Sequence, residues 1–460
     1  MLRDKYEVDK FFLDIQGLTS AMEPELAQID KVLDDEVIYQ MVKGDLARRY
    51  PKTQKTGRKS TPVEVILRIL VVKHLYNLSY EKTEKAVKDS LVLRRFCRVY
   101  FETVPDDTTL IRWSNQIKPE TLKALQERIV QIARELKVTK GRKLRTDGTV
   151  VETHIHYPTD SSLLNDGVRV LSRHLKRAQK VLGAGMEIGK SIFRDRRRSA
   201  RKLKRQIEGL ARRGAEKTKP LYRKLVRIAR ASVRQAQTVS EKLQAEQPQT
   251  TETLQQQLQN FVTHTQQVLE QTIRRVFKQE RVPAAEKILS IFEPHSDIIK
   301  RGKAGKPSEF GHKVWLDEVE GGIVSDYRIL EGNPGDSEQW QVAIDRHIEQ
   351  FGKAPDQASA DRGVYSKPNE DYATGKGVKR VILPKAGYKS QKRRQHERQS
   401  WFRRGRRFHA GVEGRISVLK RKHGLDRCLN RGLDGFQRWV GWGIIANNLT
   451  KIGQTRATSA

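Results

Sequence analysis

Three acidic side chains stand in contexts where carboxylates could act together on a phosphodiester. Asp147 lies in the strand-like segment KLRTDGTVVET, Asp361 ends a strand-like segment in ADRGVYS, and Glu413 lies in the helical segment GVEGRISVLK. Mg²⁺ prefers oxygen ligands and binds through few protein carboxylates together with substrate phosphate oxygens. Two such ions, about 3.5–4 Å apart, can activate a water or a 3′-hydroxyl and stabilise the leaving oxygen. The trio is therefore a candidate site for metal-dependent phosphoryl transfer.

Each acid alone also has a plainer interpretation. An Asp at a strand end is more often a turn cap, and a Glu on a basic helix is more often the partner of a cation one turn away. A cation bound by an otherwise isolated carboxylate would offset the cost of leaving that charge unpaired. The residues alone leave the trio open, because other acids compete with it, namely Glu152, Asp160, Asp166, Asp317 and Asp326.

The chain carries a large excess of positive charge. Its 460 residues include 90 Lys and Arg against 55 Asp and Glu, a formal net charge of +35. This excess predicts a polyanionic partner, because cations that neutralise phosphates release condensed counterions. A basic protein of ribosomal type is the alternative, and the ordered hydrophobic strands described below argue against it.

Cysteines and apolar runs exclude several other classes. Cys97 and Cys428 form no CxxC pair, which excludes a zinc finger and argues against a disulfide framework. The first residues, MLRDKYEVDKFF, lack the apolar region of a secretory signal. The best apolar run, VILRILVVKHLYNL, contains Arg68 and Lys73 and is too short to span a bilayer. We expect a protein of a reducing cytoplasm with no membrane partner.

The elements that position the acids divide the chain into several parts. We predict a loosely packed, partly helical leader over residues 1–57, a helical domain over 58–137, and an α/β domain over 138–450. A helical insertion over 161–290 interrupts that last domain, and residues 451–460 form a tail.

Short helices follow one another in the predicted helical domain. Pro62 lies near the start of the first helix, Ser79 precedes the second, and Asp106 can cap the fourth. A run of this kind resembles a helix-turn-helix DNA-binding module. Arg112 falls on the fourth helix, where we expect it to contact DNA.

Strands alternate with helices from residue 140 onward. The segment RKLRTDGTVVETHIHY is rich in Val and Thr and suits paired strands that turn near Asp147-Gly148 or at Pro158. Two further strands, GHKVWLDEV and GGIVSDYRIL, are predicted to form a hairpin through Glu320. A helix and two more strands follow, and this alternation predicts a mixed α/β sheet.

Two segments concentrate positive charge. Residues 171–230 of the predicted insertion hold 21 Lys and Arg against 4 Asp and Glu, which favours contact with the DNA backbone over a merely solvated helix. Residues 385–431 hold 16 Lys and Arg against 3 Asp and Glu, with aromatic residues interleaved. Arginines can clamp phosphates, so we expect DNA contacts here. The expected contacts are Arg403, Arg404, Arg406, Arg407 and Arg415.

Three blocks of the sequence resemble the catalytic blocks of bacterial insertion-sequence transposases of the DDE class. These are TDGTVVETHIHYPTDSSLL, ADRGVYS and GVEGRISVLKRKHGLDRC, and the helical segment from GRKSTPVEVILRIL to DDTTLIRW resembles the N-terminal domain of the same proteins. The resemblance implies an RNase H-like fold in which Asp147, Asp361 and Glu413 are the catalytic, metal-binding triad. It implies Mg²⁺, with Mn²⁺ able to substitute, and double-stranded DNA, both element ends and target, as the partner.

By the same likeness the enzyme binds terminal inverted repeats, frees 3′-hydroxyls and joins them to target DNA. Holding two ends implies a homodimer or a larger assembly in the bacterial cytoplasm, at the nucleoid. Relatives often carry a Tyr, an Arg three residues on, the Glu four further and a Lys seven further. Glu413 and Lys420 fit this spacing, whereas His409 and Arg406 replace the Arg and the Tyr.

This departure leaves the subgroup open, and an ISNCY-like group with a helical insertion is our interpretation. Lys420 is either a phosphate contact or a member of the solvated basic run LKRKH. Two other functions stay open. One is a catalytically silent or domesticated DNA-binding protein, and the other is an RNase H-like nuclease that only hydrolyses.

Overall fold

The computed structural model describes residues 1–19, 21–49, 59–181, 194–246, 248–303 and 306–459, which form two compact units. We call residues 1–154 with 311–460 the sheet unit, and residues 155–310 the bundle unit. The bundle unit contains the predicted insertion. The predicted leader's last residues, and part of the insertion, lie outside the described ranges.

Nine short helical elements form the N-terminal part of the sheet unit. They are α1 (Lys10–Thr19), α2 (Pro24–Leu33), α3 (Glu36–Leu46), η1 (Ala47–Arg49), α4 (Val63–Leu75), α5 (Tyr80–Asp89), α6 (Leu91–Phe96), α7 (Asp107–Ser114) and α8 (Pro119–Glu135). The predicted caps are present: Ser79 accepts a hydrogen bond from the backbone of Lys82 at 3.2 Å, and Asp106 accepts one from Thr109 at 2.8 Å. The prediction of a loosely packed leader is wrong, because α2 and α3 bury a row of apolar side chains in the main core.

A mixed sheet follows these helices. Its strands in the sheet unit are β1 (Lys143–Thr153), β3 (Lys306–Val319), β4 (Ile323–Leu330), β5 (Gln357–Ser359), β6 (Arg380–Ile382) and β7 (Arg427–Cys428). The order is β4-β3-β1-β5-β6: β3 and β4 are antiparallel to their neighbours, and β5 and β6 are parallel to β1. β7 pairs with the far end of β1. The first residues of β3 belong to the bundle unit.

The strand that carries Asp147 is longer than predicted. β1 continues without interruption through Asp147 and Gly148, so the turn expected there is absent. Gly148 instead makes room for a neighbour, since a Cβ at this position would lie 3.2 Å from the Trp315 ring across the strand pair. The predicted hairpin between β3 and β4 is confirmed and turns through η5 (Glu320–Gly322).

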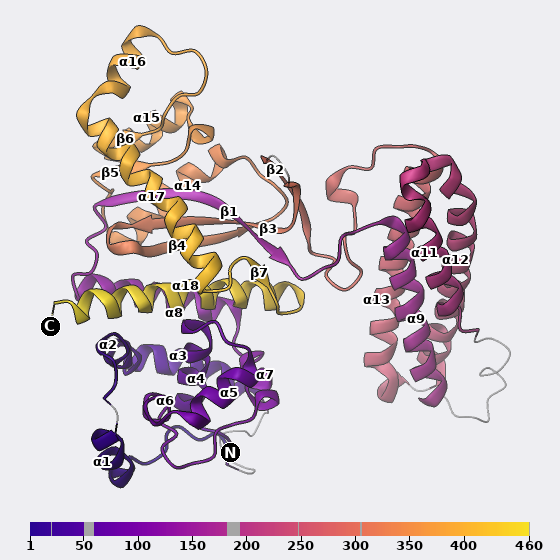
Figure 1. Cartoon of the computed structure of the whole chain (residues 1–460), viewed down its shortest axis with the longest axis horizontal. Coiled ribbons are helices and arrows are strands. Elements are labelled where there is room, and N and C mark those ends of the chain that lie inside the picture. Colours follow the sequence, from indigo (N-terminus) through magenta and orange to yellow (C-terminus); the bar gives the residue numbers. More distant parts are fainter. Residues whose placement is uncertain (20, 50–58, 182–193, 247, 304–305, 460) are drawn as a thin grey trace. The chain divides into compact units, whose positions relative to one another are not determined.

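Helices cover both faces of the sheet (Figure 1). They are α14 (Asp336–Phe351), η6 (Arg362–Val364), α15 (Lys367–Gly375), α16 (Gln391–Arg398), α17 (Ser400–Lys422) and α18 (Gly432–Ala457). α17 packs on the face that Arg145 points to, whereas α14 packs on the opposite face, with Trp340 and Leu144 in one core. α18 lies against α2, α4 and α8 and joins the N-terminal helices to the sheet. No helix of the described residues is long and apolar enough to cross a membrane.

The bundle unit has a core of its own. Its elements are α9 (Asp160–Val181), α11 (Arg197–Leu210), η2 (Ala211–Arg213), α12 (Ala215–Glu246), α13 (Pro248–Thr272), the π-helical η3 (Ile273–Phe277), η4 (Ala284–Glu286) and β2 (Asp297–Lys303). Leu171, Leu225, Val262 and other apolar residues at helical spacing pack together between the four long helices. The mainly helical insertion that the sequence predicts is present.

Candidate active site

Asp147 lies on β1, and Asp361 lies two residues past the end of the neighbouring parallel strand β5. Arg145 of β1 is level with Ser359 of β5, and the same register carried two residues further sets Asp147 level with Asp361. Side chains alternate along a strand, so Asp147 shares the face of Arg145, whose guanidinium reaches α17. Asp361 keeps an extended backbone (φ −71°, ψ 168°) just before η6 and is exposed. Both carboxylates therefore belong to the α17 side of the sheet.

His409 links the end of β5 to the helix that carries Glu413. It lies one helical turn before Glu413, and its ring hydrogen-bonds the backbone of Ser359. Burial lowers the pKa of His409, while the negative charges of Asp361 and Glu413 raise it and the positive charge of Arg145 lowers it further. The half-buried ring of His409 thus interacts with Asp361, just after β5, and with Glu413 on α17.

A buried glutamate fixes α17 on β1. Glu318 of β3 is fully buried and accepts two hydrogen bonds from Arg145, at 2.7 and 2.8 Å, and one from Arg415 of α17 at 3.1 Å. Arg145 also donates to the backbone oxygen of Phe408 at 2.5 Å, and Arg415 donates to Asn447. Each arginine is two residues from a predicted catalytic acid. Because they hold β1 and α17 together, we call Glu318, Arg145 and Arg415 the clamp.

Glycines let α17 approach the sheet closely. A Cβ at Gly411 would lie 2.2 Å from Nη1 of Arg145, and one at Gly405 would lie 2.4 Å from Ile382 of β6. Gly414, on the same helix, has no atom within 4 Å of its Cβ position. The two close glycines explain why a helix tolerates residues that lower helix stability by roughly 1 kcal/mol each.

A second buried carboxylate lies behind β1. Thr146, next to Asp147, donates a hydrogen bond to Asp317 at 2.5 Å, and the Trp315 indole donates another at 3.1 Å. Burial raises the pKa of Asp317 to about 6, although the positive charge of Arg328 opposes that shift. Asp317 lies on the face of the sheet away from α17, the face opposite to that of Asp147. Its position therefore does not support Asp317 as an alternative member of the trio.

Two families of known proteins match the sequence at opposite ends of this architecture. The family described as Transposase domain (DUF772) matches residues 14–116, which hold the end of α1 and all of α2 to α7. The family described as Transposase DDE domain matches residues 371–453, which hold α17 with Glu413 and most of α18. The two ends of the chain are thus similar to transposase domains, the second of them of the DDE class. The resemblance to insertion-sequence transposases is thereby confirmed, while neither match tests the ISNCY-like subgroup.

The matches leave the middle of this transposase uncovered, including Asp147 and Asp361. The chain is 26% identical over 155 residues to a Rhizobium meliloti protein named "Uncharacterized protein ORF8 in nfe locus", which covers 32% of this chain and 72% of that protein. No solved structure matches the transposase.

The donor chemistry of the transposase trio suits a hard divalent cation. Three carboxylates, and no Cys, supply the oxygen ligands that Mg²⁺ and Mn²⁺ accept. Within the described residues, no group of three or more His, Cys, Asp or Glu is gathered tightly enough to hold a metal by itself. Mg²⁺ commonly binds through one or two carboxylates together with the phosphate oxygens of a substrate. The residues therefore fit the metal that DDE transposases use.

The predicted DNA contacts of the transposase lie in different environments. Arg112 on α7 is exposed, and so are four arginines of α17, namely Arg403, Arg404, Arg406 and Arg407. Lys420 is partly exposed and lies 3.7 Å from Asp426. Arg415 is only 12% exposed and belongs to the clamp, which favours a structural role over the predicted phosphate contact. No structural observation places DNA on any of them, so the contacts remain predictions.

Sequence reasoning missed Glu318, and the signal for it is faint. It stands in WLDEV, an otherwise apolar strand segment, directly after Asp317. A charged residue inside a buried strand needs a partner. The partner could be named only once β1 and β3 were paired, since Arg145 and Glu318 are opposite each other in that register.

Proposed function

We propose that this transposase cuts the ends of its own insertion sequence to free 3′-hydroxyls and joins them to target DNA. The order β4-β3-β1-β5-β6, antiparallel on one side of β1 and parallel on the other, supports an RNase H-like sheet. The helical N-terminal part is proposed to recognise the terminal repeats. Two ends must be held together, so a homodimer or larger assembly is the proposed active form.

The arrangement around His409 supports this proposal. Asp147 lies on β1, Asp361 lies two residues after the neighbouring β5, and both Asp361 and Glu413 act on the half-buried ring of His409. We assign Asp147, Asp361 and Glu413 to hold Mg²⁺ or Mn²⁺ against the scissile phosphate. When bound, the ions activate the attacking oxygen and stabilise the leaving oxygen. The exposed arginines of α17 would bind the flanking phosphates.

The test replaces Asp361 with Asn. Asp361→Asn keeps the side-chain size but removes the charge, so cleavage and strand transfer of a duplex carrying the element's end should fall by at least about a thousandfold. DNA binding at the same salt concentration should persist or tighten, because a negative charge near phosphate is lost. Gel assays with Mg²⁺ or Mn²⁺ measure both steps, and anisotropy measures binding.

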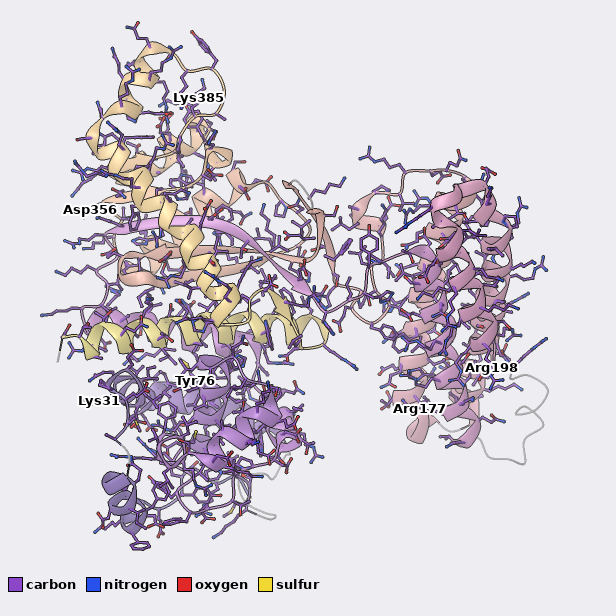
Figure 2. The ribbon with its side chains drawn as sticks, viewed as in Figure 1. Lys31, Tyr76, Arg177, Arg198, Asp356 and Lys385 are labelled. Carbon is purple, nitrogen blue, oxygen red and sulfur yellow. The ribbon has the colours of Figure 1, made fainter. Side chains whose placement is uncertain are left out.

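Asp356→Asn is the matched control, since Asp356 lies at the other end of β5 and pairs with Lys379 at 3.0 Å (Figure 2). It should cleave as the wild type does. Near-normal cleavage by Asp361→Asn would return Asp361 to the role of a turn cap. A pre-cleaved end separates the alternatives: a nuclease leaves it unjoined, and a silent DNA-binding protein neither cuts nor joins.

A further inference from the structure

The bundle unit carries a groove that the proposed chemistry does not use. It lies between α12 and the continuous α13–η3 segment and encloses about 1360 Å³. Val226, Val233 and Leu269 form its floor and are at most 6% exposed. The charged residues along its two walls determine what it can bind.

One wall is a row of four arginines. Arg223, Arg227, Arg230 and Arg234 of α12 line the groove, and all four are exposed. Their spacing of three or four residues sets them on one helix face, over roughly 16 Å at 1.5 Å per residue. Among the described residues, none of the four forms an ion pair with a carboxylate. This wall therefore keeps its full positive charge.

The other wall is largely neutralised. Arg274 pairs with Glu280 at 2.9 Å and with Glu286 at 2.6 Å, and Lys278 lies 3.8 Å from Glu280. Glu270 adds a further negative charge on this side. The groove is thus asymmetric, and a single strand of negative charge would be attracted to the α12 side.

We propose that this groove binds the phosphate backbone of duplex DNA along α12. Arginine forks match phosphate oxygens in a bidentate way, so a row of four arginines can contact up to four backbone phosphates. A protein helix in such a groove would need exposed apolar anchors along both walls. Val226, Val233 and Leu269 are buried, and the partly exposed Ile273 and Phe277 lie on the wall opposite the arginines, so the α12 side offers charge alone. The inference rests on the proposed function, because it gives the same enzyme a second DNA contact outside the active site.

The experiment measures binding of the full-length protein to a short fluorescein-labelled duplex of arbitrary sequence, in EDTA and over a range of salt. The test variant carries Arg223→Gln, Arg227→Gln, Arg230→Gln and Arg234→Gln. Its affinity near 150 mM salt should fall at least about tenfold, and the slope of log K against log salt should shrink by about 3–4, roughly 0.9 per lost phosphate contact. Four Arg→Lys changes at the same positions keep the charge and should restore most of the slope.

The matched control removes four cations from α11, which belongs to the same basic segment 171–230 but lies outside the groove, so it distinguishes the groove from the segment as a whole. It carries Arg198→Gln, Arg201→Gln, Lys202→Gln and Arg205→Gln, and Figure 2 labels Arg198 on this helix. The control should bind within about threefold of wild type. Equal losses in both variants would mean that only net charge matters and would overturn the groove. Unchanged binding by the test variant would also overturn the proposal that the groove binds DNA. An acidic protein segment would then be the remaining occupant of the groove.

These outcomes separate the two proposals. If the wild type and the test variant bind duplex DNA equally well, the groove proposal is rejected and the proposed function is not. A wild-type protein that binds no DNA defeats both the groove and the transposase chemistry. Circular dichroism melts of each variant show whether a loss of binding comes from a loss of fold.

Discussion

Glu318 shows how one side chain can support a catalytic site without touching its substrate. The carboxylate joins the strand of Asp147 to the helix of Glu413, because its two arginine partners each lie two residues from one of those acids. Two positive charges surround one fully buried negative charge. Removing the negative charge would leave two largely buried guanidinium groups facing each other without it.

Glu318→Gln tests this support. We expect the free energy of unfolding of the sheet unit to fall by about 3–5 kcal/mol, as for other buried ion pairs that lose one partner. Urea unfolding followed by circular dichroism measures the change. Glu331→Gln is the control, since Glu331 is exposed just after β4, and it should shift stability by less than about 0.5 kcal/mol. Equal stability of both variants would contradict the clamp.

Asp317 predicts a pH effect of the opposite sign to that of most carboxylates. Burial raises its pKa to about 6 in the folded protein, above its ordinary value of 3.8. Its contribution to stability is therefore fully present below about pH 4 and is lost as the pH rises through 6. The stability difference between wild type and Asp317→Asn should fall by about 3 kcal/mol over that range, at 1.36 kcal/mol per pKa unit.

Denaturant unfolding at several pH values between 4 and 7 measures this difference. The Asn variant cannot titrate, so the subtraction removes the contributions of the other carboxylates that both proteins share. Parallel stability curves would show that Asp317 does not take up a proton in this range.

At the residue scale, the sequence offers chemistry and local context, and the catalytic role of the three acids stays a prediction. Two strand-end acids and a helical Glu could be named, and the resemblance to known transposases selected them from their competitors. The clamp could not be predicted, because its three members lie far apart in the sequence and meet only through the β1–β3 register. His409 was noted only as a departure from the family spacing, and its burial between Asp361 and Arg145 was not foreseen.

At the scale of elements, α17 is positioned by its glycines. Gly405 and Gly411 allow the helix to lie directly on β6 and on the Arg145 side chain. Helix boundaries were predictable from caps at Ser79 and Asp106, since these depend on residues a few positions apart. The uninterrupted β1 was not predictable, because Asp147-Gly148 is also a strong turn signal and only the Trp315 ring across the strand pair explains the glycine.

Gly411→Ala and Gly414→Ala form a matched pair on this helix. Alanine should stabilise an open helical position by about 0.5–1 kcal/mol, so Gly414→Ala should raise the thermal midpoint. At Gly411 the new methyl group would displace Arg145 from Glu318 and from the Phe408 backbone oxygen, so we expect a net loss of about 1–3 kcal/mol. Calorimetry measures both, and stabilisation by Gly411→Ala would show that Arg145 has room to move.

At the scale of the whole molecule, the two units carry different kinds of charged residues. The acids proposed as the trio lie in the sheet unit, on β1, just after β5 and on α17, while the arginines of α12 form a row in a unit with its own core. The sequence predicted the insertion and its charge from composition alone. It could not predict the groove, because the sides of α12 and α13 that form its walls depend on how the four helices pack.

The insertion also constrains how the protein can be made. Glu152 and Gly311 are strand partners, yet the whole bundle unit separates them in sequence. A ribosome adding roughly 5–20 residues per second leaves β1 without its partner for many seconds. Within the bundle unit, the rings of Tyr157 and Phe310 meet at 5.5 Å, so a folded bundle holds its own two ends together. A bundle that folds first therefore shortens the loop that β3 must close, reduces its entropic cost, and limits the time that the edge of β1 is open to aggregation.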